Sequence, residues 1–228
     1  MDVGVREGAS MSGRVRRVAA PVREQVVEQL REAIETLELK PGQRLFERDL
    51  VEQMGASRPS IREALRRLES ERLVVSVPNK GTFVATITRK EVREIYQVRT
   101  SLEGAAVRSF TDSAPDSQVH DLKNAGKAIR EAIAGADPKA LLRAKTDFYE
   151  VLLDGAGNQT AQEILVGLHI RISTLRATSL SRPGRPEQMV QEIEDIVAAV
   201  ERRDAEAALH ASTRHVVQSE RSVLDALS

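Results

Sequence analysis

The spacing of apolar residues predicts three short helices in the N-terminal part of the chain. The first begins at Val22 and ends at the Pro and Gly of residues 40–43, and its apolar face consists of Val26, Val27, Leu30, Ile34 and Leu37. A second helix over residues 47–54 stops at Gly55, a residue type favoured just past a helix end. Ser57 is a suitable N-cap for the third helix.

The hydrophobic period changes after Arg72. The stretch "LVVSVPNKGTFVATI" holds two β-branched, apolar runs on either side of residues 78–81, which predicts a β-hairpin with a tight turn. The order helix, helix, turn, helix, hairpin is that of a winged helix-turn-helix.

The rest of the chain has only helical periodicity. Six segments are expected, over residues 91–111, 116–135, 138–154, 159–181, 186–202 and 204–226. Because no strand pattern competes, we expect an antiparallel helical bundle. The fold class is therefore mainly α, with a flexible tail over residues 1–20, a winged helix-turn-helix over 21–88 and an all-α domain over 89–228.

Composition excludes several kinds of site. The chain has 228 residues, no cysteine and a formal net charge of zero, so disulfides, thiolate metal sites and cysteine nucleophiles are ruled out. No run reaches the roughly 18 apolar residues that a membrane span requires, and we expect a soluble cytoplasmic protein. The sequence shows no phosphate-binding Gly-rich loop, nucleophile elbow or His-containing metal motif, which argues against an enzyme.

The third helix carries two stripes of different chemistry. One is apolar and consists of Ile61, Leu65 and Leu68, and the other, about a quarter turn away, consists of Arg58, Arg62 and Arg66. Arginine can bond guanine O6 and N7 together and can also bind phosphate, so the second stripe suits DNA reading. The alternative is a solvated face held by helical pairs with Glu63, Glu69 and Glu71.

The stretches "RLFERDLVEQMGASRPSIREALRRLESERLV" and "PNKGTFV" resemble the DNA-binding domain of the GntR family of bacterial transcription regulators. The resemblance implies that Arg58 and Arg62 read base edges and that Arg48 reaches the groove or the backbone. It also implies phosphate contacts from Ser57 and Ser60, and a wing tip formed by Asn79, Lys80 and Gly81. Three positions depart from the family pattern: Leu37, where Gly is common, Val51, where Ala is common, and Pro59, where Thr is frequent.

The second half resembles the FCD ligand-binding domain of the FadR-type GntR subfamily, in the stretches "EIYQVRTSLEGAAV", "FYEVLLDGAGN" and "SRPGRPEQMVQEI". That subfamily usually holds a divalent metal with one Asp and three His. The matching positions here are Lys145, Tyr149, Ile193 and His215, so three of the four ligands are replaced. Since one imidazole cannot hold a metal that needs about four donors, we expect no metal and no cofactor.

Cations stand where the apolar stripes of the bundle helices run. Lys145 lies among apolar residues at helical spacing, and Arg99 and Arg171 flank their own stripes in the same way. We hypothesise that these cations, with Tyr149 and His215, bind a carboxylate effector directly. The alternative is that each cation reaches solvent or pairs with a glutamate such as Glu103.

Together these features predict a homodimeric, sequence-specific DNA-binding regulator, a repressor by family habit. Its partners would be an operator in double-stranded DNA and a small acidic metabolite. Two alternatives stay open: an architectural DNA-binding protein without an effector, and a metal-dependent sensor with a rearranged metal site.

Overall fold

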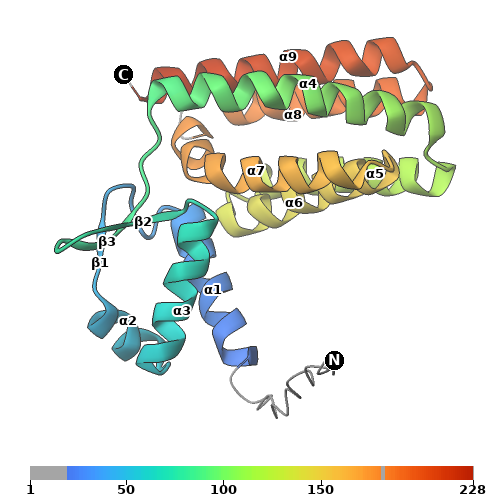
Figure 1. The fold of residues 1–228 in the computed structure, drawn as a ribbon. Coiled ribbons are helices and arrows are strands. Elements are labelled where there is room, and N and C mark those ends of the chain that lie inside the picture. The colour runs from blue at the N-terminus through green and yellow to red at the C-terminus, as the bar shows by residue number, and fades with distance from the viewer. Residues whose placement is uncertain (1–19, 181–182, 228) are drawn as a thin grey trace, which may run out of the picture.

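The computed structural model describes residues 20–180 and 183–227, which form a small winged helix-turn-helix beneath one end of a helical bundle (Figure 1). The helices are α1 Ala20–Glu35, α2 Glu47–Met54, α3 Arg58–Ser70, α4 Arg89–Ser113, α5 Asp116–Ala134, α6 Pro138–Gly155, α7 Gln159–Leu180, α8 Arg185–Glu201 and α9 Ala205–Ala226. The strands are β1 Arg44–Leu45, β2 Val74–Val77 and β3 Gly81–Val84. The tail expected over residues 1–20 lies outside the described residues, except for Ala20 at the start of α1.

The wing is a three-stranded antiparallel sheet with the order β1-β3-β2. Phe83 in the central strand pairs with Val75 of β2 on one side and with Arg44 of β1 on the other. The hairpin predicted from the sequence is confirmed, but β1 was not foreseen. A strand of two residues is too short to show alternation, although its Leu45 is buried in the core of the winged part.

The third helix begins and packs as its sequence predicts. The Ser57 side chain accepts a hydrogen bond of 3.3 Å from the backbone N–H of Ser60, and Pro59 occupies the first turn. Ile61 and Leu68 are fully buried, in one cluster with the apolar face of α1. This packing fixes the angular position of the arginine stripe that lies beside the apolar one.

The first helix ends at Glu35, before the Pro-Gly pair that was expected to stop it. Leu37 closes the helix in the left-handed region with φ of 62°, and the Leu39 N–H donates to the Ala33 carbonyl at 2.9 Å. The positive φ explains why Gly is common at this position in the family pattern, because Gly adopts that conformation without strain.

The six helices of the second half pack lengthwise, with α4, α8 and α9 in one layer and α5, α6 and α7 in the other (Figure 1). Thr88 and Glu91 form a capping box at the start of α4, with bonds of 3.2 and 2.9 Å. The core is apolar and includes Val107, Phe110 and Phe148. Within residues 89–180 and 183–227 there is no strand, which confirms the all-α expectation.

Contacts between the winged part and the bundle involve α6 and α7. Ile170 of α7 packs against the apolar core of the winged part. At the start of α6, the Lys139 ammonium lies 3.2 Å from a Glu32 carboxylate oxygen of α1. The helix that carries Ile170 therefore contacts both parts of the molecule.

Candidate DNA-binding surface and effector pocket

Arg58, Arg62 and Arg66 of α3 are all exposed, so the arginine stripe faces solvent. The Arg62 Nε donates to both carboxylate oxygens of Glu47 on α2, at 2.9 and 3.0 Å, while 58% of the side chain remains exposed. Arg66 lies 3.5 Å from Glu63 one turn away. The arginine stripe is thus accessible from solvent. Its ion pairs are exposed and therefore weak.

Two of the three glutamates that could have paired with the arginine stripe instead contact other helices and strands. Glu69 accepts a hydrogen bond of 2.9 Å from the backbone N–H of Ser76 in β2. Glu71 pairs with Arg31 of α1 at 2.8 Å and lies farther, 3.4 Å, from Arg67. Of these three glutamates, only Glu63 therefore pairs solely with an arginine of its own helix, as the alternative of a solvated face requires.

The other expected DNA-contacting residues lie around the start of α3. Arg48 has 85% of its side chain exposed, and Ser57 and Ser60 join their hydroxyls at 2.9 Å beside the helix N-terminus. A helix N-terminus offers backbone N–H groups that favour phosphate. Arg48 and Ser57 are exposed and Ser60 is half-buried.

The wing tip is built on two residues with positive φ, Asn79 at 62° and Gly81 at 99°, and Lys80 between them is exposed. A residue missed from the sequence supports it: the Arg44 guanidinium lies 4.7 Å from the Phe46 ring centroid and 5.9 Å from that of Phe83. A side chain at position 81 would meet the Arg44 guanidinium at 3.3 Å. Only the pairing of β1 with β3 brings these residues together, so sequence spacing gave no signal for them.

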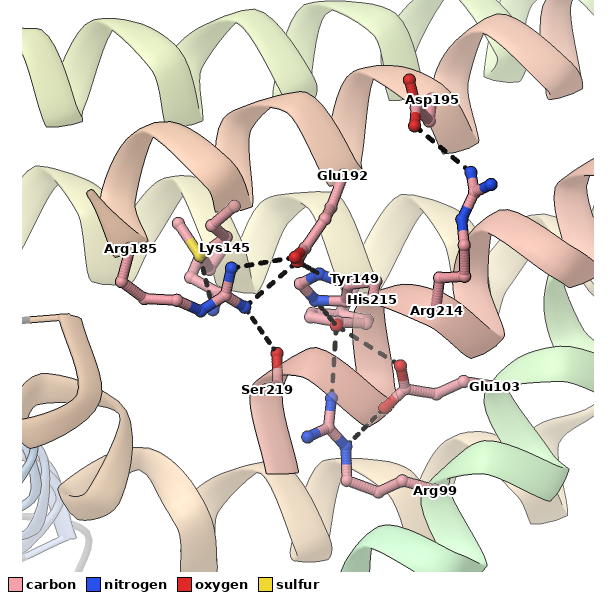
Figure 2. Close-up of polar contacts among 11 residues, drawn as sticks. Arg99, Glu103, Lys145, Tyr149, Arg185, Glu192, Asp195, Arg214, His215 and Ser219 are labelled. Carbon is pink, nitrogen blue, oxygen red and sulfur yellow. Dashed lines mark hydrogen bonds and ion pairs between the residues drawn. The ribbon is translucent and has the colours of Figure 1, made fainter. Parts of the chain in front are cut away.

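A polar pocket lies inside the bundle, lined by residues of α4, α6, α8 and α9 and by the last residue of α7. Its polar lining residues are Tyr96, Arg99, Lys145, Arg185, His215 and Ser219, and its apolar ones are Leu180 and Met189. Figure 2 shows five of the polar lining residues together with the carboxylates of Glu103 and Glu192. Three expected effector-binding residues, Arg99, Lys145 and His215, thus line one pocket.

Arg99 is buried in a network with a carboxylate and a phenol. Its Nε donates to Glu103 at 2.6 Å and its Nη2 to the Tyr149 hydroxyl at 3.4 Å. His169 contacts the same Glu103 carboxylate at 2.8 Å. Burial by itself would raise the pKa of Glu103, but the Arg99 charge and the His169 hydrogen bond more than offset this and hold that pKa well below its usual range.

His215 belongs to a second group of side chains across the pocket. Its Nδ1 donates to Glu192 at 2.7 Å, because a carboxylate only accepts, and its Nε2 lies 3.5 Å from the Tyr149 hydroxyl. Arg185 forks onto Glu192 at 3.0 and 3.1 Å and donates to Ser219 at 3.1 Å. Burial lowers the pKa of His215, and the Glu192 hydrogen bond opposes that shift only in part, so the imidazole is neutral.

Two of the five expected effector-binding residues need separate description. Tyr149 does not line the pocket, but its hydroxyl contacts both Arg99 and His215, which do. Arg171 does not line the pocket: its Nη2 lies 3.5 Å from Glu91 at the start of α4. The expectation that Arg171 binds the effector therefore receives no support from the geometry, since its charge is placed near the winged part.

Residues missed by sequence reasoning complete the pocket, namely Tyr96, Arg185, Glu192 and Ser219. Among the positions aligned with the family's metal ligands, Ile193 is buried in the apolar core and Lys145 contacts the Met189 sulfur at 3.5 Å. Within residues 20–180 and 183–227, no three His, Cys, Asp or Glu side chains are grouped in a way that could hold a metal ion. The pocket is lined by three cationic side chains, those of Arg99, Lys145 and Arg185.

A winged helix-turn-helix with an exposed arginine stripe, joined to a bundle with a buried polar pocket, defines a ligand-responsive DNA-binding protein. Residues 22–84 match the model of bacterial regulatory proteins of the gntR family, and residues 94–218 match that of the FCD domain. The chain belongs to the GntR family of bacterial transcriptional regulators and carries an FCD ligand-binding domain. As such it is a regulator that binds DNA, and its relatives are regulators rather than enzymes.

Curated relatives are similar over most of their length. The HTH-type transcriptional regulator YdhC of Bacillus subtilis (strain 168) is 30% identical over 185 residues, which cover 81% of this chain and 83% of the relative. The HTH-type transcriptional repressor RspR of Escherichia coli (strain K12) is 27% identical over 203 residues, 89% of each chain. A D-xylose utilization operon repressor of Paenarthrobacter nicotinovorans is 28% identical over 199 residues, covering 87% of this chain and 85% of the relative.

Solved structures show the same fold. E. coli McbR/YncC superposes with a TM-score of 0.79 at 21% identity, covering 91% of this chain and 99% of that one. A GntR regulator from Rhodococcus sp. RHA1 superposes with a TM-score of 0.77 at 24% identity, covering 89% and 97%. No helix in the described part of the chain has the length and apolar character needed to span a membrane.

Proposed function

We propose that this protein is a cytoplasmic, homodimeric repressor that leaves its operator when a small carboxylic acid binds in the bundle pocket. The observation that carries the effector class is the convergence of three buried cations, Arg99, Lys145 and Arg185, on one pocket. Anions stabilise buried cations, and a ligand carboxylate would add one to the carboxylates of Glu103 and Glu192 that already contact Arg99 and Arg185. Repression is supported by the names of two relatives, each called a repressor.

The DNA-binding half of the proposal assigns base reading to Arg58 and Arg62, and backbone contacts to Arg48, Ser57 and Ser60. The wing residues Asn79, Lys80 and Gly81 would enter the adjacent minor groove. One recognition helix reads only a few base pairs, so a dimer on two half-sites about one helical turn apart supplies the needed affinity and specificity.

The test begins with operator selection from random duplex DNA and footprinting of the purified full chain. Operator affinity is then measured by fluorescence anisotropy with each of a panel of small organic acids, with and without chelator. We expect a two-fold symmetric footprint and an acid that weakens operator binding by at least about 5-fold, the lower end of typical allosteric coupling. A footprint indifferent to every acid would instead favour the architectural alternative.

A further inference from the structure

We infer that Arg44 is a further DNA-contacting residue, whose guanidinium binds the phosphate backbone between the groove read by α3 and the groove entered by the wing. The ring of Phe46 holds that guanidinium in position. This inference rests on the proposed DNA-binding surface, to which it adds one phosphate contact and one positioning residue.

Arg44 lies on an exposed face of the wing sheet that carries apolar side chains. It pairs with Phe83 of β3, which also pairs with Val75 of β2, and residues directly opposite each other in a sheet point to the same side. Val75 is 45% exposed, and Phe46, two residues after Arg44, is 49% exposed. Leu45 points the other way and is buried in the core of the winged part. The outer face of the wing therefore presents an arginine among apolar side chains.

The Arg44 guanidinium is held by aromatic rings instead of by a carboxylate. Its Cζ lies 4.7 Å from the Phe46 ring centroid and 5.9 Å from that of Phe83. Among the residues that the structure describes, none forms an ion pair with Arg44, whereas Arg62 and Arg66 of α3 each have a glutamate partner. A guanidinium that stacks on a ring keeps its in-plane N–H donors available. Arg44 is thus an exposed cation that is fixed in place and open to an anion.

The position of Arg44 connects the two parts of the proposed DNA-binding surface. On one side, a side-chain carbon built at Gly81 in the wing tip would lie 3.3 Å from the guanidinium. On the other side, the chain passes from β1 through Phe46 into α2, whose Glu47 contacts Arg62 of α3 (Figure 1). One sugar–phosphate backbone separates the two grooves of a duplex, so a residue between the recognition helix and the wing faces phosphates. The planar fork of arginine suits phosphate because it donates to two oxygens.

The test measures the salt dependence of DNA affinity by fluorescence anisotropy, with the full chain on the selected operator and on a random-sequence duplex, between about 50 and 200 mM salt. Arg44→Ala should weaken binding to both duplexes by the same factor, about 10-fold, because phosphate contacts carry no sequence information. It should also reduce the slope of log affinity against log salt by about 0.9, the value for one lost phosphate contact. Arg44→Lys keeps the charge and should restore the slope, while its affinity stays below wild type because lysine lacks the planar fork.

Phe46→Leu separates positioning from contact, because leucine keeps an apolar side chain but has no aromatic face for the guanidinium. We expect binding to both duplexes to weaken by about 2- to 5-fold, the equivalent of an exposed cation–π contact, with the salt slope kept. In the Arg44→Ala background, Phe46→Leu should cause no further loss. A loss of the same size in both backgrounds would show that Phe46 contacts DNA by itself and would overturn its positioning role.

Arg108→Ala is the matched control for a lost positive charge. Arg108 is exposed on α4 and pairs with Glu206 of α9, outside the winged part, so this variant should change neither the affinity nor the slope. Thermal unfolding of every variant checks that the winged part stays folded. A slope reduced as much in Arg108→Ala as in Arg44→Ala would show that net charge and not a contact sets the slope, and would overturn the inference.

The remaining outcomes distinguish this inference from the proposed function. Weaker binding of Arg44→Ala to the operator alone would show that Arg44 reads a base, and would overturn the phosphate contact. Unchanged DNA binding in Arg44→Ala, together with weaker binding in Arg62→Ala, would overturn the inference and leave the rest of the proposed surface in place. If neither variant weakens binding to either duplex, the proposed DNA-binding surface itself fails.

Discussion

Arg62 has a partner inside the protein and a proposed one outside it. Its bond to Glu47 uses the Nε edge of the guanidinium, and more than half of the side chain stays exposed. The sequence predicted the exposed stripe from helical phase alone. It did not predict the Glu47 contact, because that contact depends on how α2 crosses α3.

Replacing Arg62 by Ala tests base reading. Loss of a bidentate contact to a guanine should cost roughly 1–3 kcal/mol on the cognate operator and relax the base preference at that position. Anisotropy titrations on the operator and on random duplex would measure both effects, with Arg66→Ala as the neighbouring control. Equal weakening on both DNAs would show that Arg62 contacts only phosphate.

His215 gives the fold a pH dependence with a defined sign. Burial lowers its pKa in the folded state, so the unfolded chain takes up the proton first as the pH falls. The stability from the neutral imidazole is complete above about pH 6.5 and is lost as the pH falls from there toward the folded pKa. The charged groups that act on the His215 imidazole are Lys145, Glu192 and Glu103. The pKa of each glutamate is lowered in the folded state, so the stability that the two carboxylates contribute is lost only below about pH 4.5.

Denaturant unfolding between pH 5 and 8 would measure this effect. We expect the free energy of unfolding of wild type to fall below about pH 6.5, and His215→Gln to show a shallower slope there. His210→Gln, at an exposed position on the same helix, serves as the control and should keep the wild-type slope. A wild-type slope in His215→Gln would assign the pH dependence to other groups.

At the residue scale, the sequence predicted which way a side chain points better than it predicted which residues that side chain contacts. Helical phase showed that Arg99 and Lys145 point into the bundle, and they do. It could not show that Glu192 and Arg185, which belong to another helix, meet them there. Which helix faces which is decided by packing of the whole bundle, and no spacing within one segment encodes it.

At the scale of elements, long periodic segments were predicted well and short ones poorly. All six bundle helices agree with the expected ranges to within about two residues at each end. The exceptions are β1, too short for a period, and the end of α1, where Leu37 takes a conformation that favours Gly. Packing contacts between elements override local preference at both places.

The approach of α6 to α4 depends on a glycine. A side-chain carbon built at Gly155 would overlap the ring of Phe110, which is fully buried. Gly155→Ala should therefore destabilise the protein by about 1–3 kcal/mol through overpacking. Gly167→Ala on α7 is the matched control: nothing lies within 4 Å of its added carbon, so it should stabilise by about 0.5–1 kcal/mol. Thermal or urea unfolding of the two variants gives the comparison, and two changes of the same sign would contradict it.

At the scale of the whole molecule, three consecutive residues of α7 face three different partners. His169 contacts Glu103, which also bonds Arg99 of the pocket. Ile170 packs into the core of the winged part, and Arg171 pairs with Glu91 where α4 begins. A ligand that altered the hydrogen bonds of Arg99 would thus act next to the turn of α7 that contacts the DNA-binding part.

Ile170→Ala tests whether this turn couples the two sites. The variant keeps the pocket intact, so ligand stabilisation should remain, while the ligand's effect on operator affinity should change by about 0.5–2 kcal/mol. Lys139→Ala, which removes an exposed ion pair between the same two parts, should change the coupling less. Calorimetry and operator anisotropy on each variant separate the two quantities. If the ligand changed operator affinity in Ile170→Ala as much as in wild type, the two sites would be coupled through other residues.

The Arg62–Glu47 pair has a consequence for how a regulator of this kind would search a chromosome. On random duplex, the backbone contacts proposed for Arg48, Ser57 and Ser60 would hold the protein to phosphates and let it slide. Arg62 would then keep the Glu47 carboxylate that it contacts in the structure, since an unmatched base offers no better acceptor. Only a guanine in the right register offers a better fork. In this proposal Glu47 would weaken binding to random DNA and so favour long-lived binding at the operator.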